Sequence, residues 1–371
     1  MYLKRDYPSY SSIPSLARYR GSVERLSPIS FVFATIMLLF AVPAWGVQDS
    51  VQKFPMPMVS SAADLEEAQV LLKNKKWAEA AVVFRSVVRK LPDYSPAAMG
   101  LARALVFSNR REEALAVLWR AADREKAPNR SVLIRRGRVI SRQFLSSGSF
   151  QVYQDGLSFL QARKYRQARE RFEKALAQEP DNVEVLVRLG QCLALDQDYD
   201  SATEYLRFAK RLNPHEPEIR LWLGRTMHQR GEIKEAIEEL RLAKAQLQNS
   251  ELAPVWLSAA LFSYGQKVQA TQVLEEDIKA QPYHLASLLH LAWTRTQAVS
   301  RDNQALWAAR KDMQLILSRL DQYEKSGASS AIWLAEGELG LNLRQSAAEL
   351  KAEANKLLQQ IESRLGQPAK A

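Results

Sequence analysis

The chain has 371 residues, of which 47% are hydrophobic and 25% are charged, and its formal net charge is +11. These proportions are ordinary for a soluble protein. With 14 glycines and no convincing period-two pattern, an all-helical fold is the expected class. The single cysteine, Cys192, excludes an internal disulfide and a paired-cysteine metal site, and its place on an inward helix predicts a buried apolar thiol.

Residues 1–46 differ from the rest of the chain. A polar, basic leader is followed by 14 residues without a charge, 29–42, and then by Pro43-Ala44-Trp45-Gly46. This order predicts a secretory signal peptide, cleaved after Ala44 or Gly46. An uncleaved membrane anchor is the alternative, since residues 28–45 approach the span of about 20 residues that a bilayer requires. A buried helix of the fold is a third, less favoured reading. Lipoprotein processing is excluded, because no cysteine lies near the segment.

Either of the first two alternatives would export the rest of the chain, because the basic leader stays in the cytoplasm. We therefore expect an exported protein, in the bacterial periplasm rather than a eukaryotic lumen, either soluble or anchored to the inner membrane. Residues 47–61 form a polar linker that contains Pro55 and Pro57.

A 34-residue period begins after the linker. It is marked by six alanines, with one interruption: Ala80, Ala114, Ala168, Ala202, Ala236 and Ala270. Twelve residues before each alanine stands a small residue: Ala68, Ala102, Gly156, Gly190, Gly224 and Ser258. Four residues after it stands a bulky one: Phe84, Leu118, Phe172, Leu206, Leu240 and Leu274. Seven residues after it, a series of apolar residues ends in an exception: Val87, Ala121, Ala175, Ala209, Ala243 and Asp277.

This spacing is typical of a helix–turn–helix solenoid. Two antiparallel helices pack closely only where each has a small side chain at the crossing point, and the bulky residue one turn later fills the space beside it. Proline ends four of the units, at Pro92, Pro180, Pro214 and Pro282, because it cannot continue a helix.

The pattern of small residue, alanine, bulky residue and proline resembles the tetratricopeptide repeat (TPR) family. The resemblance implies a right-handed α-solenoid, with units one and two at 62–126 and units three to six at 149–282. Between them, residues 127–148 are predicted to form an irregular helical insert. A degenerate seventh unit is expected at 283–322. After a break at 326–330, a C-terminal capping helix is expected at 331–365, covering the open end of the solenoid.

The resemblance also implies that the first helix of each unit lines a concave groove that binds a partner peptide or helix. The groove positions lie three before and one and four after the small residue. In units one to three they are Leu65, Gln69, Leu72, Met99, Arg103, Val106, Tyr153, Leu157 and Leu160. In units four to six they are Val187, Gln191, Ala194, Leu221, Arg225, His228, Val255, Ala259 and Phe262. Trp222 and Trp256, beside these positions, belong to the groove or to the core between repeats, and the core is favoured.

Positive charge is concentrated in residues 103–142, where eleven basic residues face four acidic ones. The region is either a solvated face or a contact for an anionic membrane, a wall polymer or an acidic protein. The residues proposed for that contact are Arg130, Arg135, Arg136, Arg138 and Arg142. Nucleic acid is not an expected partner of an exported chain without a recognition motif.

Catalytic signals are absent from the sequence. The histidines His215, His228, His284 and His290 do not form a metal-binding pair at helical spacing, and no phosphate-binding glycine loop or nucleophile elbow occurs. No cofactor, metal site or enzymatic activity is predicted. The leading hypothesis is an exported scaffold whose groove recruits a protein partner in envelope assembly. The rival is a membrane-tethered array that uses the basic region 103–142.

Overall fold

The computed structural model describes residues 59–248, 250, 252–281, 284–298, 303–325, 332–333, 344–345 and 347–366. The predicted leader, 1–46, and the linker up to residue 58 lie outside these residues. The first helices in the chain are α2 (Val59–Lys73), α3 (Trp77–Lys90), α4 (Ser95–Phe107), α5 (Arg111–Arg124), α6 (Asn129–Arg142), α7 (Ser147–Gln161), α8 (Tyr165–Gln178) and α9 (Val183–Leu195). They are followed by α10 (Tyr199–Leu212), α11 (Pro217–Arg230), α12 (Ile233–Gln246), α13 (Leu252–Ser263), α14 (Lys267–Ala280), α15 (Leu285–Ala298), α16 (Asn303–Lys325) and α17 (Ala347–Leu365).

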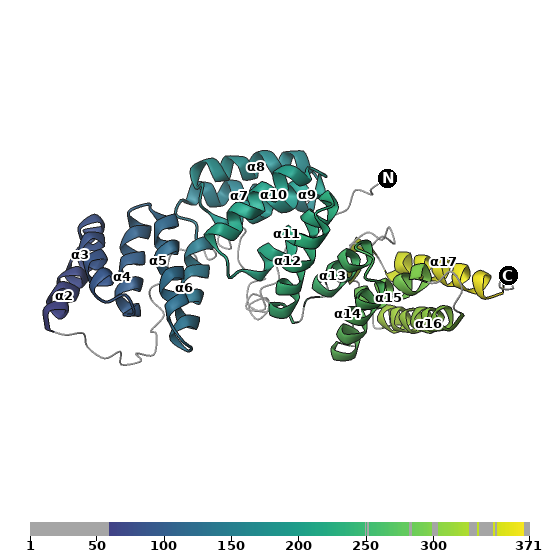
Figure 1. Ribbon diagram of the computed structural model, residues 1–371. Helices are drawn as coiled ribbons and strands as arrows, with labels where there is room; N and C mark the ends of the chain where they lie inside the picture. Colours follow the sequence, from purple (N-terminus) through teal and green to yellow (C-terminus); the bar gives the residue numbers. More distant parts are fainter. Residues whose placement is uncertain are drawn as a thin grey trace.

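The helices form an elongated stack in which neighbours in sequence are neighbours in space (Figure 1). The six predicted units are the helix pairs α2–α3, α4–α5, α7–α8, α9–α10, α11–α12 and α13–α14. Successive first helices also touch one another, in the pairs α2–α4, α9–α11, α11–α13 and α13–α15. Because helices on the inside of a curved stack lie closest together, these first helices line its inner face.

The packing predicted from the 34-residue period is confirmed. All six alanines are 0% exposed, and the six bulky residues that follow them are at most 2% exposed. A Cβ atom added at Gly190 would lie 2.7 Å from Cγ of Leu206, and one added at Gly224 would lie 2.6 Å from Cγ of Leu240. The small residue of one helix therefore touches the bulky residue of its partner, as the spacing requires.

The six turns within these units share one backbone conformation. Five residues before each alanine, φ is positive: Lys75, Asn109, Arg163, Gln197, Gly231 and Gly265. The next residue donates its N–H to a carbonyl five residues back, as in Glu232 to Met227 at 2.9 Å and Asp198 to Leu193 at 2.9 Å. This pattern is a Schellman ending. Only two of the six turns use glycine, so tertiary packing holds the other four in the left-handed region.

Asp277, the exception in the apolar series, is explained by the start of the next unit. Asp277 is 8% exposed, and its carboxylate lies 2.9 Å from Nδ1 of His284 and accepts a hydrogen bond of 2.6 Å from the Ser287 hydroxyl. A buried carboxylate is tolerated where polar partners satisfy it. Asp277 thus joins α14 to the beginning of α15.

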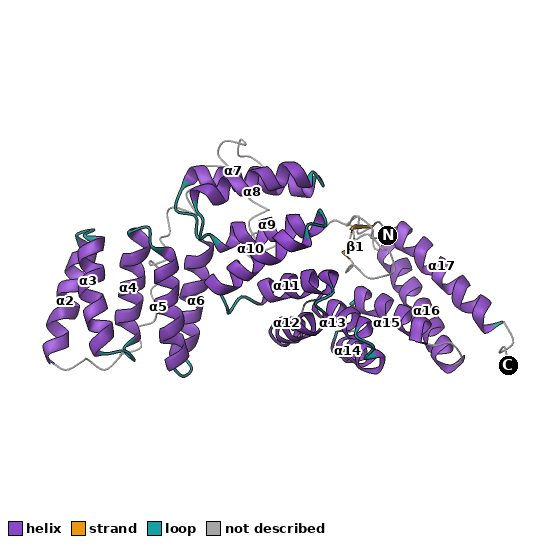
Figure 2. Ribbon diagram, turned by 45° about the horizontal axis from the view of Figure 1, so that its top comes forward, coloured by secondary structure: helices purple, strands orange, loops and turns teal. Residues whose placement is uncertain are grey.

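The predicted helical insert is α6, which extends the first two units by one helix. Gly137 of α6 lies against the Trp119 indole of α5, where a Cβ atom would overlap the ring. Beyond α6 the stack changes direction, and α7 and α8 run across the preceding helices in both views (Figures 1 and 2). The stack continues because α6 packs on α9, and α5 on α10.

The C-terminal end departs from the prediction. The predicted capping helix at 331–365 is wrong in its first part, because Ile332–Trp333 (β1) and Arg344–Gln345 (β2) form a two-residue antiparallel pair. Among the described residues of this range, the helical part is α17, and it packs on α16 through Ala354 and Ile361, which are 2% and 0% exposed. Arg364 donates a 2.8 Å hydrogen bond to the carbonyl of Thr296, so α17 also closes over the end of α15.

Candidate partner-binding surface

The groove positions predicted from the repeat register lie on the inner helices, but most are not open to solvent. Val187 and Leu221 are 0% exposed, Val255 is 1% exposed and Gln191 is 2% exposed. The other buried positions are Leu65, Leu72, Val106, Tyr153, Leu160, Ala194, Arg225 and Ala259. Gln69 is exposed, and a further set is partly exposed: Met99, Arg103, Leu157, His228 and Phe262. The inner face is thus accessible at a subset of the predicted positions.

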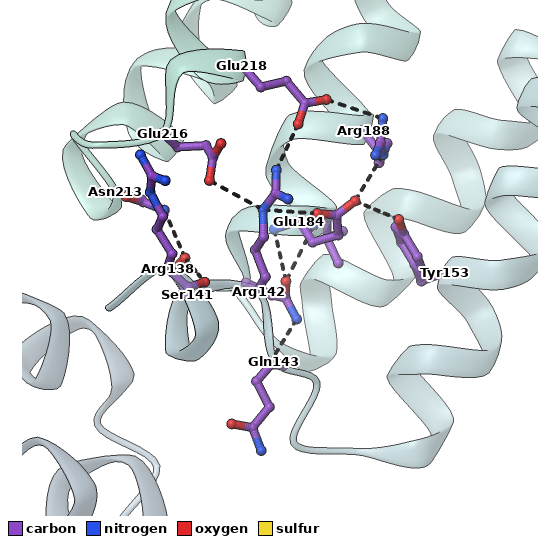
Figure 3. A network of polar contacts seen from close by, with 12 residues as sticks. Arg138, Ser141, Arg142, Gln143, Tyr153, Glu184, Arg188, Asn213, Glu216 and Glu218 are labelled. Atoms are coloured by element: carbon purple, nitrogen blue, oxygen red, sulfur yellow. Dashed lines mark hydrogen bonds and ion pairs between the residues drawn. The ribbon is translucent and has the colours of Figure 1, made fainter. Parts of the chain in front are cut away.

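In units three and four, a network of ion pairs covers the predicted groove positions (Figure 3). Arg142 of α6 points toward three carboxylates: Glu184 of α9, Glu218 of α11, and Glu216 of the loop that precedes α11. Its Nη2 lies 2.8 Å from Glu218, and its Nε lies 3.3 Å from Glu184 and 3.8 Å from Glu216. Burial alone would lower the pKa of Arg142, but these three carboxylates raise it above its ordinary value.

Three inner-face residues complete this network. The Tyr153 hydroxyl donates a 2.8 Å hydrogen bond to Glu184, and Arg188 lies 3.0 Å from the same carboxylate. Gln191 accepts a 2.9 Å hydrogen bond from Arg188 and donates one of 3.3 Å to Glu218. Burial alone would raise the pKa of Glu184, but Arg188 and Arg142 lower it. The predicted groove residues Tyr153 and Gln191 therefore hold the insert in place.

A second buried arginine ties α5 to the loops on either side of unit three. Arg111 is 1% exposed and pairs with Glu179 at 2.7 Å and Asp181 at 3.1 Å. It also donates a 2.7 Å hydrogen bond to the carbonyl of Gln143, which follows α6. The other oxygen of Glu179 accepts the backbone N–H groups of Leu145 and Ser146, so the loop into α7 is fixed as well.

The five arginines of the predicted anion contact on α6 fall into two groups: two that contact other parts of the chain and three that are exposed or partly exposed. Arg142 is neutralised by glutamates of its own chain, and Arg138 donates to the carbonyl of His215. The prediction that these two residues bind an external anion is therefore wrong, because α6 docks through them on the start of α11. Arg130 and Arg135 are exposed and Arg136 is partly exposed.

The inner face of units four to seven has its own 34-residue series, two positions before the small residue: Arg188, Trp222, Trp256 and His290. Trp222 is 0% and Trp256 is 3% exposed, so the favoured assignment of both to the core is confirmed. Their rings meet edge to face at 5.3 Å between centroids. The Arg225 guanidinium lies over both, 5.4 Å from Trp222 and 5.3 Å from Trp256, which is a cation–π arrangement.

The last member of this series, His290, is 1% exposed, and neither ring nitrogen has a hydrogen-bond partner among the described residues. Its ring stacks on Trp293 at 5.3 Å. Burial, with His228 nearby, lowers the pKa of His290 to about 3. Burial, with Arg225 nearby, lowers the pKa of His228 to about 4. Both rings are therefore neutral at physiological pH, and His228 lies 2.9 Å from the Ser263 hydroxyl.

Among the described residues, no group of three histidine, cysteine, aspartate or glutamate side chains is placed to hold a metal ion. No helix in the described part of the chain is long and apolar enough to cross a membrane. Cys192 is 0% exposed, and burial raises the pKa of its thiol to about 12, which confirms the predicted buried thiol.

Reasoning from sequence missed several residues of this face. Arg142 was named, but as a contact for an external anion, and the ion pairs of Arg111 were missed, because the partners of both residues lie in other units. His290 and Trp293 had a usable signal, since His290 continues the series of Trp222 and Trp256 at the same spacing.

Family models of known repeats agree with the helix pairs described above. One family model, described as tetratricopeptide repeat, matches residues 153–217. A second model with the same description matches residues 71–129 and 193–255. A search of curated proteins found no match. Among solved structures, yeast Tom70 is 14% identical, with 94% of this chain and 77% of that chain covered and a TM-score of 0.42.

Two further solved structures illustrate the range of matches. YrrB, described as a TPR protein with an unusual peptide-binding site, is 21% identical, with 55% of this chain and 95% of that chain covered and a TM-score of 0.34. A tetratricopeptide repeat protein from Parabacteroides merdae is 13% identical, with 81% of this chain and 99% of that chain covered and a TM-score of 0.40. The family models match the same residues as the helix pairs, so residues 71–129 and 153–255 carry tetratricopeptide repeats.

Proposed function

We propose that this protein is a non-enzymatic scaffold that binds a peptide or helix of a partner protein on its inner face, at units five to seven. Proteins of this repeat family generally mediate protein–protein interactions. The observation that carries the proposal is the combination of aromatic, histidine and arginine side chains on α11, α13 and α15. Arg225 and His228 are polar side chains that apolar packing alone does not require, and Phe262 and Trp293 lie beside each other on α13 and α15.

His228 and Phe262 offer a partly exposed contact, and the buried side chains of Arg225 and Trp293 lie on the same inner helices. Phe262 is partly exposed and lies 5.1 Å from the Trp293 ring, and Lys267 lies 5.4 Å over its face. Aromatic residues and arginine are the side chains that most often dominate binding energy at protein interfaces. A helix or extended segment with apolar anchors matches such a surface. Units three and four are less suitable, because the ion-pair network around Arg142 occupies Tyr153 and Gln191 of their inner positions.

We further propose that the partner lies in the cell envelope and that the protein acts there after export. The support is the order of residues 1–46, a basic leader followed by an apolar core. Fractionation of cells tests this part: a mature protein that begins near Trp45 or Val47 supports export with cleavage. A full-length protein in the membrane pellet supports the anchored alternative, and a full-length soluble cytoplasmic protein contradicts both.

The binding surface is tested by affinity capture with the full chain and two matched double variants. H228A/F262A removes two partly exposed inner side chains, whereas V82A/L242A removes two exposed apolar side chains from outer helices. We expect the inner variant to lose captured partner at least tenfold and the outer variant to retain it, with circular dichroism unchanged in both. Equal recovery by the two variants would place the contact elsewhere.

A further inference from the structure

An outer pocket separate from the inner face lies where α3, α4 and α5 meet. Its volume is about 260 Å³. Its floor is apolar and includes Leu101 and Val117, and its walls include four arginines: Arg85, Arg89, Arg120 and Arg124. The arginines come in two pairs at i, i+4 spacing, one on α3 and one on α5, so each pair lies on one face of its helix.

Among the residues that the structure describes, one carboxylate forms an ion pair with an arginine of this pocket. Arg85 lies 3.3 Å from Glu113, which is shared with Arg110. The Arg120 Nε donates 3.1 Å to the carbonyl of Ala116 in its own helix, which leaves its charge uncompensated. Arg89 and Arg124 form no ion pair with any residue that the structure describes. Four guanidinium groups therefore share one pocket with one carboxylate at its edge.

Two other contacts between the second helices of neighbouring units are arranged differently. Between α12 and α14, a related pocket is crossed by the ion pair of Lys244 with Glu276 at 3.5 Å. Glu276 stands six residues after Ala270, and Arg120 stands six residues after Ala114, so the two occupy the same repeat position. Between α10 and α12, Lys210 pairs with Glu239. The α3–α5 contact alone among these three places arginine opposite arginine.

We propose that this outer pocket binds a phosphate monoester group of an organic ligand. A phosphate monoester has about 1.5 to 2 negative charges near pH 7, which matches the uncompensated charge better than a single carboxylate does. Guanidinium groups bind phosphate oxygens in paired hydrogen bonds, and arginine clusters are a recurrent means of phosphate recognition. The apolar floor receives the carbon atoms next to the ester oxygen.

The pocket is independent of the proposed partner surface. It is formed by the second helices α3 and α5 and the outward side of α4, whereas the inner face of units five to seven is formed by α11, α13 and α15. A ligand in the pocket and a partner on the inner face can therefore be bound at the same time, and each proposal can fail alone.

Phenyl phosphate is a suitable probe, because it combines the monoester with a small apolar body. We expect calorimetric titration of the full chain, at constant ionic strength, to give one site that binds phenyl phosphate at least tenfold more tightly than benzoate. R89Q/R124Q should weaken binding at least tenfold. The matched control R166Q/K174Q, which removes two exposed positive charges from α8, should leave it unchanged.

A second variant tests the pocket through its charge pattern. R120E places a carboxylate at the repeat position of Glu276, and we expect it to abolish phenyl phosphate binding without lowering the melting temperature. Equal weakening by the control and pocket variants, or benzoate binding as tight as phenyl phosphate, would overturn the proposal. The proposal would also be overturned if the protein sedimented with phosphatidate vesicles but did not bind phenyl phosphate. The arginines would then form a flat basic surface that binds membranes rather than a pocket for a phosphate monoester.

Discussion

At the scale of single residues, His290 is a buried polar group without compensation. A neutral imidazole has one N–H donor and one acceptor nitrogen, and neither has a partner here among the described residues. Leaving a buried polar group unsatisfied costs about 1–3 kcal/mol. The His290 ring packs on Trp293. Because protonation of a buried imidazole is unfavourable, the pH dependence of the free energy of unfolding reports on the burial of this ring.

Replacing His290 by leucine should make the protein more stable and less sensitive to acid. In the unfolded chain, histidine takes up a proton near pH 6.5, whereas His290 in the fold stays neutral down to about pH 3. The unfolded state therefore binds more protons between these values, and stability falls as the pH drops through that range. For His290 the loss is about 3 kcal/mol between pH 6.5 and 4, from about 1.4 kcal/mol per pH unit.

Urea unfolding at pH 7, 5.5 and 4.5 measures this effect. The wild-type midpoint should fall with pH, and the H290L midpoint should fall less. His228 adds a smaller loss of the same sign, since its pKa is lowered to about 4, so H228N provides a comparison. Parallel midpoints for wild type and H290L would mean that His290 is protonated in the fold.

At the scale of helices, close approach of α5 and α6 depends on Gly137. A methyl group there would overlap the Trp119 ring, which is 8% exposed and held by a 2.7 Å hydrogen bond from its Nε1 to the carbonyl of Leu212. The ring cannot move aside without losing that bond, so G137A should destabilise the fold by about 1–3 kcal/mol. The melting temperature and tryptophan fluorescence provide the measurement.

The control is a glycine that does not approach another helix. Gly148 has no atom closer than 3.5 Å to an added Cβ, so G148A should change stability little. If G137A melted at the wild-type temperature, α6 would not be docked on Trp119 as described.

The helix pairs were predictable from the sequence because each packing position repeats every 34 residues, as Ala202 and Leu206 illustrate. The left-handed turn residues Lys75 and Arg163 were not, since neither residue type favours that conformation and packing imposes it. The α6 contacts were also beyond prediction. A helix that occurs once has no repeat register, so nothing indicated that Arg142 would meet glutamates of α9 and α11 rather than an external anion.

At the scale of the whole molecule, the buried apolar residues form two clusters. One extends from α2 to α6 and includes the beginning of α9 and the end of α10, and the other extends from α7 to α17. In a solenoid, each unit is stabilised mainly by its neighbours. The junction between the clusters, at α5, α6 and α9, therefore decides whether the stack unfolds as one body, and much of that junction is polar.

Arg111 is the most buried ion-paired side chain of this junction, and R111Q should separate the two parts. The variant leaves Glu179 buried with a lost partner, and breaking a buried ion pair in this way typically costs about 3–5 kcal/mol. Because the loss falls between the clusters, it should not be shared equally along the chain. We expect amide hydrogen exchange to accelerate in α2–α6 and in the loops around unit three, while α13–α16 keep their wild-type rates.

The matched variant R85Q breaks the pair of Arg85 with Glu113, whose side chains are 34% and 48% exposed, within the first cluster. Exposed pairs contribute about 0–1 kcal/mol, so this variant should exchange like the wild type. Urea unfolding of R111Q, followed by circular dichroism, should broaden or divide into two transitions as the clusters lose their coupling. Acceleration of exchange to the same extent in α2–α6 and α13–α16 would contradict the division, because it would mean that the buried arginine stabilises a single cooperative unit.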